Sequence, residues 1–276
     1  MPARRVAALA AKWTVLVFFL VMTFVPLVWL VVSSFKTDLE LLSDPFGLPA
    51  KWLVSNYGKA IRISELHLLF LHSIIVSVGA TVLNIVVAAM GAFVLSRERF
   101  PLRNAVTNLI LAGVLIPIIG LMVPYFRLIR QLGLYDSLLA LILTYAAINI
   151  PISVFLLRGF MTTIPKELEE AVIIDGCTFA QRFTRIIFPL SKLGIVTAGT
   201  FVFLYAWNEF IYALLLTSSV SARTVQLGIR FFRSQFVTDY TAMYAAIVLT
   251  MIPTIVVYIG LHERIIKGLT SGAIKG

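Results

Sequence analysis

At residues 162–189 the chain carries the polar stretch TTIPKELEEAVIIDGCTFAQRFTRIIFP, which interrupts an otherwise apolar sequence. Its pattern predicts two short helices joined at Asp175-Gly176, where the glycine supplies the turn. Thr162 or Thr163 can cap the first helix, because a hydroxyl oxygen there accepts a hydrogen bond from a free N–H group of the first turn. The stretch is therefore expected to form a bent helix pair.

The charged and apolar residues of the stretch are segregated. The first helix begins with three acids, Glu167, Glu169 and Glu170. They lie where the positive end of the helix dipole favours negative charge. The second helix has an apolar face of residues four positions apart, Phe179, Phe183 and Ile187. Its other face is polar and carries Gln181, Arg182 and Arg185. We expect the apolar face to be buried, the polar face to be solvated and Pro189 to end the helix.

Apolar runs long enough to cross a bilayer lie on both sides of residues 162–189, so the stretch is expected to be a loop on one membrane face. We call it the 162–189 loop. An amphipathic helix pair at such a position is suited to docking against another protein. The plain alternative is a connector whose charged groups are only solvated.

The loop resembles a known motif. Glu170-Ala171-Val172, then Gly176, and later Ile186 and Pro189, are similar to the EAA loop of ABC importer permeases, with Val172 in place of the second Ala and Phe188 in place of the usual Leu. In that family the loop is the coupling helix, which sits in a cleft of a cytoplasmic ATPase subunit. The resemblance implies a coupling role for Glu167, Glu169, Glu170, Ala171, Asp175, Gly176, Phe179 and Arg182.

The composition belongs to the integral membrane class. The chain has 276 residues, of which 60% are hydrophobic and 13% charged. The net charge of +10 is spread over short segments between apolar runs and forms no basic face, which argues against a nucleic-acid partner. Cys177 is the only cysteine and the three histidines are scattered, so neither a disulfide nor a metal site is expected.

Six apolar runs predict an all-α integral membrane protein with a single transmembrane domain, residues 1–276, and both termini on one side. The expected spans are residues 13–32, 68–95, 105–123, 137–157, 193–216 and 242–261. The resemblance implies the type I ABC importer permease fold, with the coupling helix in the cytoplasm. Basic residues are more numerous on the side of the termini and of the 162–189 loop. The positive-inside rule therefore puts both termini in the cytoplasm, with the chain in the inner membrane of a bacterium.

Polar residues inside the spans are candidates for a substrate path, because such groups are costly in hydrocarbon unless they face the bundle interior or water. They are Asn149, Trp207, Asn208 and Glu209. The string Trp-Asn-Glu-Phe resembles the carbohydrate-importing branch of the family, where amide and aromatic groups suit a polyhydroxylated substrate. The alternatives are an interfacial Trp with two outward-reaching neighbours, and an Asn149 that only bonds a neighbouring helix.

The segment from about Ser218 to Tyr240 is too long for a minimal turn and carries much apolar surface that some partner or neighbouring surface should cover. In the resembling family an external binding protein docks on this face, which implies contacts from Arg223, Thr224 and Gln226. The alternative is a segment packed on its own bundle.

The tail KGLTSGAIKG, residues 267–276, lacks the spacing of a phosphate-binding loop. The chain is therefore expected to have no catalytic residues, to hydrolyse no ATP and to bind no cofactor, while ATP and Mg act in a partner ATPase. The tail resembles the Gly-rich ending of maltose-transporter-like permeases, which implies that Thr270, Ser271, Gly272 and Lys275 reach the ATPase.

These features predict the permease subunit of a binding-protein-dependent ABC transporter that imports a sugar. The sugar is expected to be a di- or oligosaccharide, or a related polyol or glycoside. The implied partners are a second permease in a heterodimer, two cytoplasmic ATPase subunits, an extracytoplasmic sugar-binding protein and membrane lipid. One alternative is a permease for another solute class. Another is an ion-coupled secondary transporter, for which Glu209 is the only intramembrane acid and no repeated broken-helix pair is evident. A membrane enzyme has no obvious catalytic pair.

Overall fold

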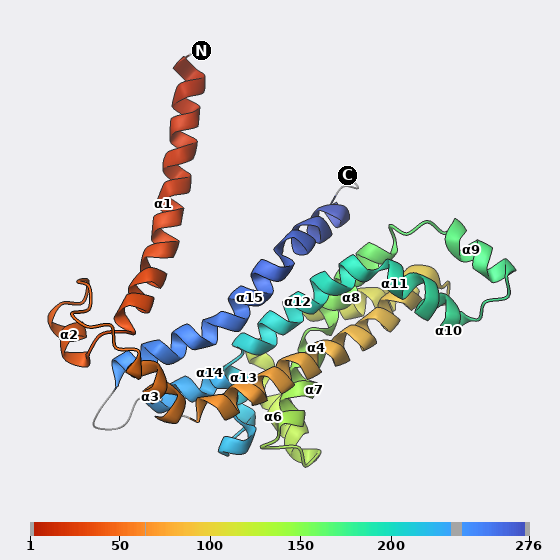
Figure 1. Ribbon diagram of the computed structural model, residues 1–276. Helices are drawn as coiled ribbons and strands as arrows, with labels where there is room; N and C mark the ends of the chain where they lie inside the picture. The colour runs from red at the N-terminus through yellow and green to blue at the C-terminus, as the bar shows by residue number, and fades with distance from the viewer. Residues whose placement is uncertain (1–2, 64, 233–238, 274–276) are drawn as a thin grey trace. The chain divides into compact units, whose positions relative to one another are not determined.

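The computed structural model describes residues 3–63, 65–232 and 239–273, and within these ranges no residue is in a strand. Two compact units are present, and each is described by itself. Unit one comprises Met1–His67 and Gly228–Ile252, and unit two comprises Leu68–Leu227 and Pro253–Gly276. Figure 1 labels the helices of both units.

Unit one contains the N-terminal helix and the segment that follows it. Its elements are α1 (Ala3–Ser33), α2 (Asp38–Ser43), α3 (Ser55–Ile63), η5 (Ile229–Phe232) and the first part of α15 (Tyr240–Ala273). Ala8–Ser33 is apolar enough to cross a membrane, as is Tyr240–Arg264. The side chain of Trp29 packs edge-on against the ring of Tyr244, with 5.6 Å between the ring centroids.

Polar contacts order the segment between α1 and α3. Thr37 and Glu40 form a capping box at the start of α2, in which the Thr37 N–H donates to Glu40 Oε2 at 2.8 Å. Lys36 is 1% exposed, and its Nζ donates to the carbonyl oxygen of Asp44 at 2.8 Å. The segment is thus a folded structure whose turns are held by its own side chains.

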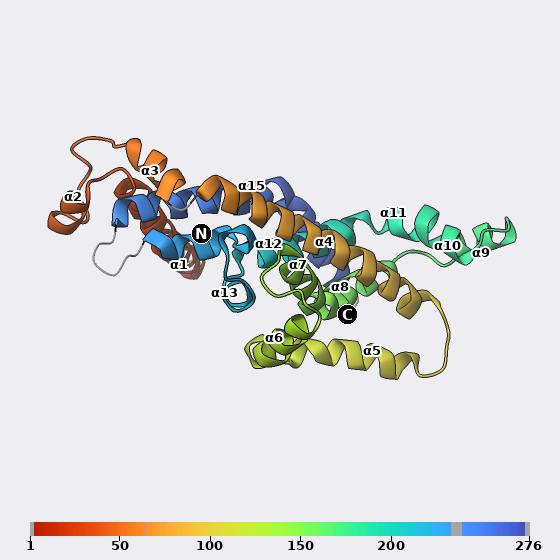
Figure 2. The same cartoon turned by 90° about the horizontal axis from the view of Figure 1, so that it is seen from below.

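Unit two contains the remaining helices. They are α4 (Leu66–Arg97), α5 (Arg103–Ala112), η1 (Gly113–Leu115), η2 (Ile118–Leu121), α6 (Met122–Gln131), α7 (Leu138–Ile148), α8 (Ile150–Met161), α9 (Glu167–Ile174), α10 (Phe179–Gln181), η3 (Arg182–Ile187), α11 (Phe188–Leu190), α12 (Lys192–Asn208), α13 (Ile211–Leu216), η4 (Val220–Ala222), α14 (Val225–Gly228) and the rest of α15. As Figure 2 shows, α5 and α6 lie to one side of α4. They pack against α8 and α13.

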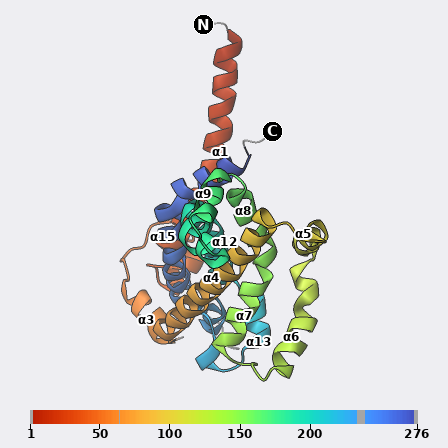
Figure 3. The same cartoon turned by 90° about the vertical axis from the view of Figure 1, so that its right-hand side faces the viewer.

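Small residues allow the core helices of unit two to approach closely. Ala80, Ala88 and Ala92 on α4 are fully buried. A Cβ built on Gly194 of α12 would lie 2.6 Å from the Phe160 ring of α8, so the contact of these two helices requires glycine there. In Figure 3 α4, α7, α8 and α12 lie together, with α5 and α6 beside them.

Two of the predicted spans contain a sharp bend, and a third bend precedes the predicted span 193–216. Arg103–Leu115 and Ile118–Gln131 are bent by 100°, Leu138–Ile148 and Ile150–Met161 by 49°, and Phe179–Leu190 and Lys192–Asn208 by 77°. The first break is at Pro117, which lacks an N–H group and holds an extended backbone with φ −64° and ψ 118°. Pro117 and Pro151, residues that can break a helix and were predicted as possible breaks, lie at the first two bends.

One boundary differs from the predicted one. The predicted run 193–216 is interrupted, because α12 ends at Asn208 and α13 begins at Ile211. The predicted stop at Pro189 is confirmed to within one residue, because the helical run Phe179–Leu190 ends there and the chain bends by 77° before α12.

Gly194→Ala is expected to lower the thermal unfolding midpoint of the purified subunit, because the new methyl group must displace the Phe160 ring. Overpacking of this kind costs about 1–3 kcal/mol. Gly159→Ala is the matched control, since a Cβ there meets no atom within 4 Å apart from its own helix backbone and sequence neighbours. Equal midpoints for the two variants would contradict the close approach of α8 and α12.

Candidate functional site

The 162–189 loop contains the predicted turn. α9 ends at Ile174, and Gly176 has a φ of +83°, a conformation that residues with a Cβ rarely adopt. The Cys177 N–H donates to the Val172 carbonyl oxygen at 3.0 Å, which satisfies a free carbonyl of the last helical turn. The turn predicted at Asp175-Gly176 is confirmed.

The predicted cap of the first helix is wrong. The Thr162 hydroxyl donates to the Gly159 carbonyl oxygen and the Thr163 hydroxyl to that of Phe160, so both bond back to the end of α8. The second helix has a cap that the sequence analysis missed. Thr178 accepts from the Gln181 N–H at 3.3 Å, and Gln181 Oε1 accepts from the Thr178 N–H at 2.8 Å. The spacing Thr-x-x-Gln is the signal that could have found it.

The apolar face of the second helix packs on α4. Phe93, which is 1% exposed, has its ring centroid 5.1 Å from that of Phe179 and 5.3 Å from that of Phe183. Ile187 is fully buried. The prediction of a buried face at these positions is confirmed for Ile187 and in part for Phe183, which is half-buried, whereas Phe179 keeps 49% of its surface exposed.

The polar face is not wholly solvated, because Arg182 is turned toward the end of α4. Its Nη2 lies 2.7 Å from Glu98 Oε1 and its Nη1 lies 3.5 Å from Glu169 Oε2. The guanidinium also stands over the Phe93 and Phe179 rings, at 5.9 and 5.5 Å from their centroids. The expectation of a solvated Arg182 is therefore corrected.

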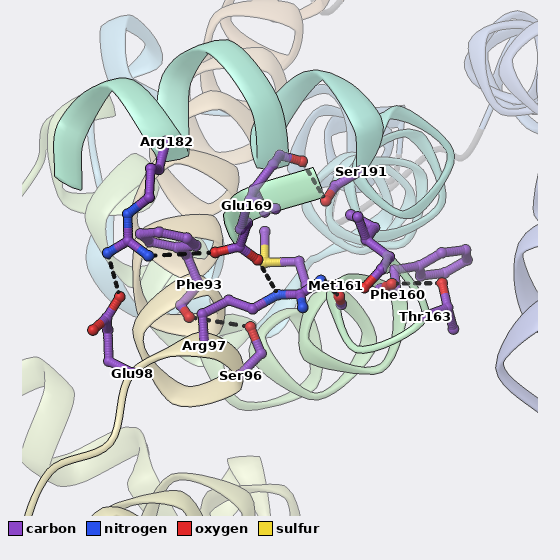
Figure 4. A network of polar contacts seen from close by, with 12 residues as sticks. Phe93, Ser96, Arg97, Glu98, Phe160, Met161, Thr163, Glu169, Arg182 and Ser191 are labelled. Atoms are coloured by element: carbon purple, nitrogen blue, oxygen red, sulfur yellow. Dashed lines mark hydrogen bonds and ion pairs between the residues drawn. The ribbon is translucent and has the colours of Figure 1, made fainter. Parts of the chain in front are cut away.

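Glu169 also points inward (Figure 4). It pairs there with Arg97, the last residue of α4. Arg97 Nε lies 2.9 Å from Glu169 Oε1, and the two side chains are 4% and 7% exposed. The Arg97 Nη2 also donates to the carbonyl oxygen of Ile164 at 2.8 Å and to that of Met161. Arg97 and Glu98 were not among the predicted site residues.

The other predicted coupling residues are exposed. They are Glu167, Glu170, Ala171, Asp175 and Gly176. Beside them are three exposed apolar side chains, Leu168 (46%), Ile173 (49%) and Ile174 (86%). The tip of the loop therefore presents acids and apolar groups together, while Glu169 and Arg182 fasten its base to α4.

A second polar centre lies at the break between α12 and α13. Glu209 is 9% exposed. Its Oε1 accepts from the Tyr212 N–H at 2.8 Å, and its Oε2 accepts from the Ala213 N–H at 3.1 Å and from the Tyr145 hydroxyl at 2.7 Å. Glu209 therefore caps the start of α13, where acids are favoured.

A cavity of about 420 Å³ adjoins this break. Its lining is Ile118, Ile119, Tyr205, Asn208, Glu209, Phe210, Ile211 and Tyr212. The Tyr212 hydroxyl donates to the Ile118 carbonyl oxygen at 2.8 Å, so the broken spans α5–α6 and α12–α13 meet at the cavity. Of the four predicted path residues, Asn208 and Glu209 line it.

Trp207 and Asn149 are not among the lining residues of the cavity. Trp207 is 1% exposed and packs with Phe70 and Phe203, at 5.7 and 6.1 Å between centroids. Asn149 is 7% exposed, and its Nδ2 donates to the Tyr145 carbonyl oxygen at the end of α7. The sequence analysis missed the tyrosines at positions 145, 205 and 212, whose clustering depends on the helix breaks.

One family of membrane transporters matches most of the chain. The match is to the binding-protein-dependent transport system inner membrane component and covers residues 84–271, which include the 162–189 loop and the Glu209 break. The chain belongs to this family. It is therefore a membrane transport permease and not an enzyme, and the resemblance noted in the 162–189 loop is confirmed.

Relatives cover nearly the whole permease. The sulfoquinovosyl glycerol transport system permease protein of Agrobacterium fabrum is 34% identical over 252 residues, which are 91% of this chain and 88% of the relative. The diacetylchitobiose uptake system permease protein NgcG of Streptomyces coelicolor is 34% identical over 274 residues, which are 99% of this chain and 90% of the relative.

A solved structure shares the fold. The crystal structure of a bacterial ABC transporter involved in the import of the acidic polysaccharide alginate contains a chain with a TM-score of 0.85 and 20% identity. The match covers 95% of this chain and 98% of that one. The predicted all-α permease fold of the type I family is confirmed.

The segment after α13 packs on α4 in this permease. The Val225 N–H donates to Ser73 Oγ at 2.7 Å, and His72 Nδ1 lies 3.1 Å from the Arg223 carbonyl oxygen. Thr224 is 2% exposed, whereas Arg223 and Gln226 are half-buried. Gln226 Nε2 lies 3.5 Å from Asn208 Oδ1, so this segment reaches a residue that lines the cavity.

Asp136, in the connection between α6 and α7, holds the start of the same segment. Its Oδ1 accepts from the Ser218 N–H at 2.7 Å and from the Ser219 N–H at 2.9 Å. Burial raises the pKa of Asp136, but the hydrogen bonds from Ser218 and Ser219 outweigh it and lower the pKa to about 2. Asp136 is therefore ionised at neutral pH, which keeps it an acceptor.

The predicted tail contacts remain predictions. α15 continues to Ala273, so Thr270, Ser271 and Gly272 lie in its last turns, and the side chains of Thr270 and Ser271 are outside the described part of the chain. Lys275 lies outside the described residues.

Glu209→Ala is expected to lower the unfolding midpoint, because two backbone N–H groups and the Tyr145 hydroxyl lose their acceptor. Each buried donor left unsatisfied costs about 1–3 kcal/mol. Glu209→Gln should fall between Glu209→Ala and the unmodified chain, since the amide keeps one acceptor oxygen. Asn208→Ala is the control, as its side chain is exposed. Thermal unfolding of the four purified subunits in one detergent measures the order, and a Glu209→Ala midpoint equal to that of Asn208→Ala would refute the capping role.

Proposed function

We propose that this permease is a transmembrane subunit of a bacterial ATP-driven, binding-protein-dependent importer that carries a sugar into the cytoplasm. The exposed tip of the 162–189 loop carries the proposal. α9 lies beyond the ends of α8 and α11 (Figure 1), and Ile174 at its end is 86% exposed beside exposed acids. Apolar groups on such a short charged helix need a partner surface. A cleft in a cytoplasmic ATPase subunit supplies one.

The cavity beside Glu209 supports a sugar as the substrate. Its volume of about 420 Å³ falls within the range of small-molecule sites. Asn208 offers an amide, and Tyr205 and Tyr212 offer aromatic rings, which together suit a polyhydroxylated ligand. Relatives named for sulfoquinovosyl glycerol and diacetylchitobiose point to a di- or oligosaccharide or a related glycoside.

Glu209 argues against the ion-coupled alternative. Both of its carboxylate oxygens already accept hydrogen bonds from groups of the chain. Both oxygens therefore serve as structural acceptors, two of their donors being the N–H groups at the start of α13. Within the described spans, Glu209, the acid that an ion-coupled transporter would need, already serves a structural role at the start of α13.

The proposed assembly has four kinds of component. A second permease subunit forms a heterodimer with this chain, two ATPase subunits bind ATP and Mg, and an external binding protein delivers the sugar. Both termini and the 162–189 loop face the cytoplasm in this proposal. The tail residues Thr270, Ser271, Gly272 and Lys275 then lie on the ATPase side.

Reconstitution into proteoliposomes tests the proposal. The chain is purified with the subunits that co-purify from native membrane, and uptake of radiolabelled di- and oligosaccharides is measured with the binding protein outside and ATP inside. Uptake is expected to require both. Uptake driven by an ion gradient in the absence of ATP and of any ATPase subunit would refute the proposal.

Gly176→Ala is expected to uncouple ATP hydrolysis from uptake, because a Cβ at a φ of +83° strains the turn that sets the angle of α9. Gly133→Ala is the matched control, since Gly133 also has a positive φ (+69°) and no atom within 4 Å of an added Cβ, but lies outside the loop. The backbone strain should cost about 1 kcal/mol in both variants.

Both variants should therefore insert and lose a similar amount of stability. Only Gly176→Ala should lower the amount of sugar taken up per ATP hydrolysed. Normal uptake per ATP with Gly176→Ala, or equal losses in the two variants, would contradict the role of this turn.

A further inference from the structure

The last residue of α4, Arg97, and the residue after it, Glu98, carry opposite charges that match opposite charges on the 162–189 loop. Arg97 pairs with Glu169 at 2.9 Å, and Glu98 pairs with Arg182 at 2.7 Å. In chain order the charges are positive then negative at residues 97 and 98, and negative then positive at Glu169 and Arg182. Figure 4 shows the two pairs side by side.

This matching of opposite charges favours one position of the loop on α4. If the loop slid or rotated on α4, Arg182 would approach Arg97 and Glu169 would approach Glu98. Like charges at short range are unfavourable, so the arrangement disfavours other positions as well as favouring this one. Glu169 also lies 3.5 Å from Arg182 through its second oxygen, which joins the two pairs into one network.

Arg97 makes hydrogen bonds in addition to its ion pair with Glu169. Its Nη2 donates to the carbonyl oxygens of Met161, at the end of α8, and Ile164, in the segment before α9. One guanidinium therefore joins the end of α4, the end of α8 and the first helix of the loop.

The Arg97–Glu169 pair is badly suited to a purely stabilising role. Within the described chain, the nearest atoms of the pair, Arg97 Nε and Glu169 Oε1, have no aligned hydrogen bond despite their 2.9 Å separation. A buried ion pair whose hydrogen bonding is incomplete recovers little of its desolvation cost. Its better-attested use is to specify position.

We propose that Arg97, with Glu98, is a positioning residue that fixes the register of the 162–189 loop on α4 and α8, so that the loop moves with these two helices as one body. The consequence for transport rests on the proposed function of the loop. The contact between Arg97 and the loop does not depend on the proposed function, and it is tested separately.

Hydrogen exchange of the α9 amides in the purified subunit tests the contact. Arg97→Gln is expected to speed exchange over residues 167–174 by about tenfold, because α9 loses its attachment to α4 and α8. Arg99→Gln, two residues away and exposed, should leave exchange unchanged. Unchanged exchange with Arg97→Gln would overturn the proposal. If that variant fails to insert, Glu169→Gln removes the same contact from the loop side, and its exchange decides in the same way.

The reconstituted importer tests the consequence. Glu98→Arg places a third positive charge beside Arg97 and Arg182, and should lower sugar uptake per ATP hydrolysed by about fivefold at unchanged assembly. Adding Arg182→Glu restores opposite charges at positions 98 and 182 and should recover part of the lost ratio. The recovery is partial because the new carboxylate at position 182 then faces Glu169 and the alternation of signs is lost.

A residue that only supports the fold would lower assembly and would not be rescued by the exchange of charges. Failure of the double variant to recover, with both variants assembled, would overturn the positioning role. An unmodified importer that shows no ATP-dependent uptake would instead refute the proposed function. The hydrogen-exchange measurement on α9 would still decide the contact between Arg97 and the loop.

Discussion

The structure depends on finding hydrogen-bond partners for the backbone groups that a helix break exposes inside a membrane. Hydrocarbon offers no hydrogen-bonding partner, so each N–H and C=O group freed by a break must find one within the protein. Glu209 accepts from the N–H groups that open α13, and the Tyr212 hydroxyl donates to the Ile118 carbonyl oxygen beside the break at Pro117. The break at Pro117 is thus satisfied partly by a side chain of α13, and the cavity lies where the two breaks meet.

These hydrogen bonds explain what the sequence could predict. Apolar length and the position of Pro117 indicate spans and a possible kink, because both are local properties. The break at Glu209 is not local. One of the three donors to Glu209, the Tyr145 hydroxyl, is 64 positions away, and a run that contains Trp-Asn-Glu-Phe is continuous by hydropathy alone. The motif therefore located the polar centre, while its geometry required the packed helices.

The 162–189 loop was predicted more fully, with one instructive exception. Its turn at Gly176 and the apolar positions Phe183 and Ile187 follow from backbone preference and periodicity. Arg182 was expected on a solvated face, and Glu169 was assigned only a place favoured by the helix dipole and a coupling role. Helix faces assigned from a single helix ignore partners elsewhere in the chain. Those partners lie at the end of α4, where basic residues were interpreted only as an orientation signal.

α4 connects the two centres physically. It is a helix of 32 residues that runs without interruption from Leu66 to Arg97. Near its start Ser73 accepts from Val225, in its middle Asn84 donates to the Ala146 carbonyl oxygen of α7, and at its end Arg97 holds the loop. The neighbouring spans bend at their breaks, but α4 offers no such hinge. A displacement of the loop base must therefore shift α4 along its length, or break the charge pairs that fasten the loop to it.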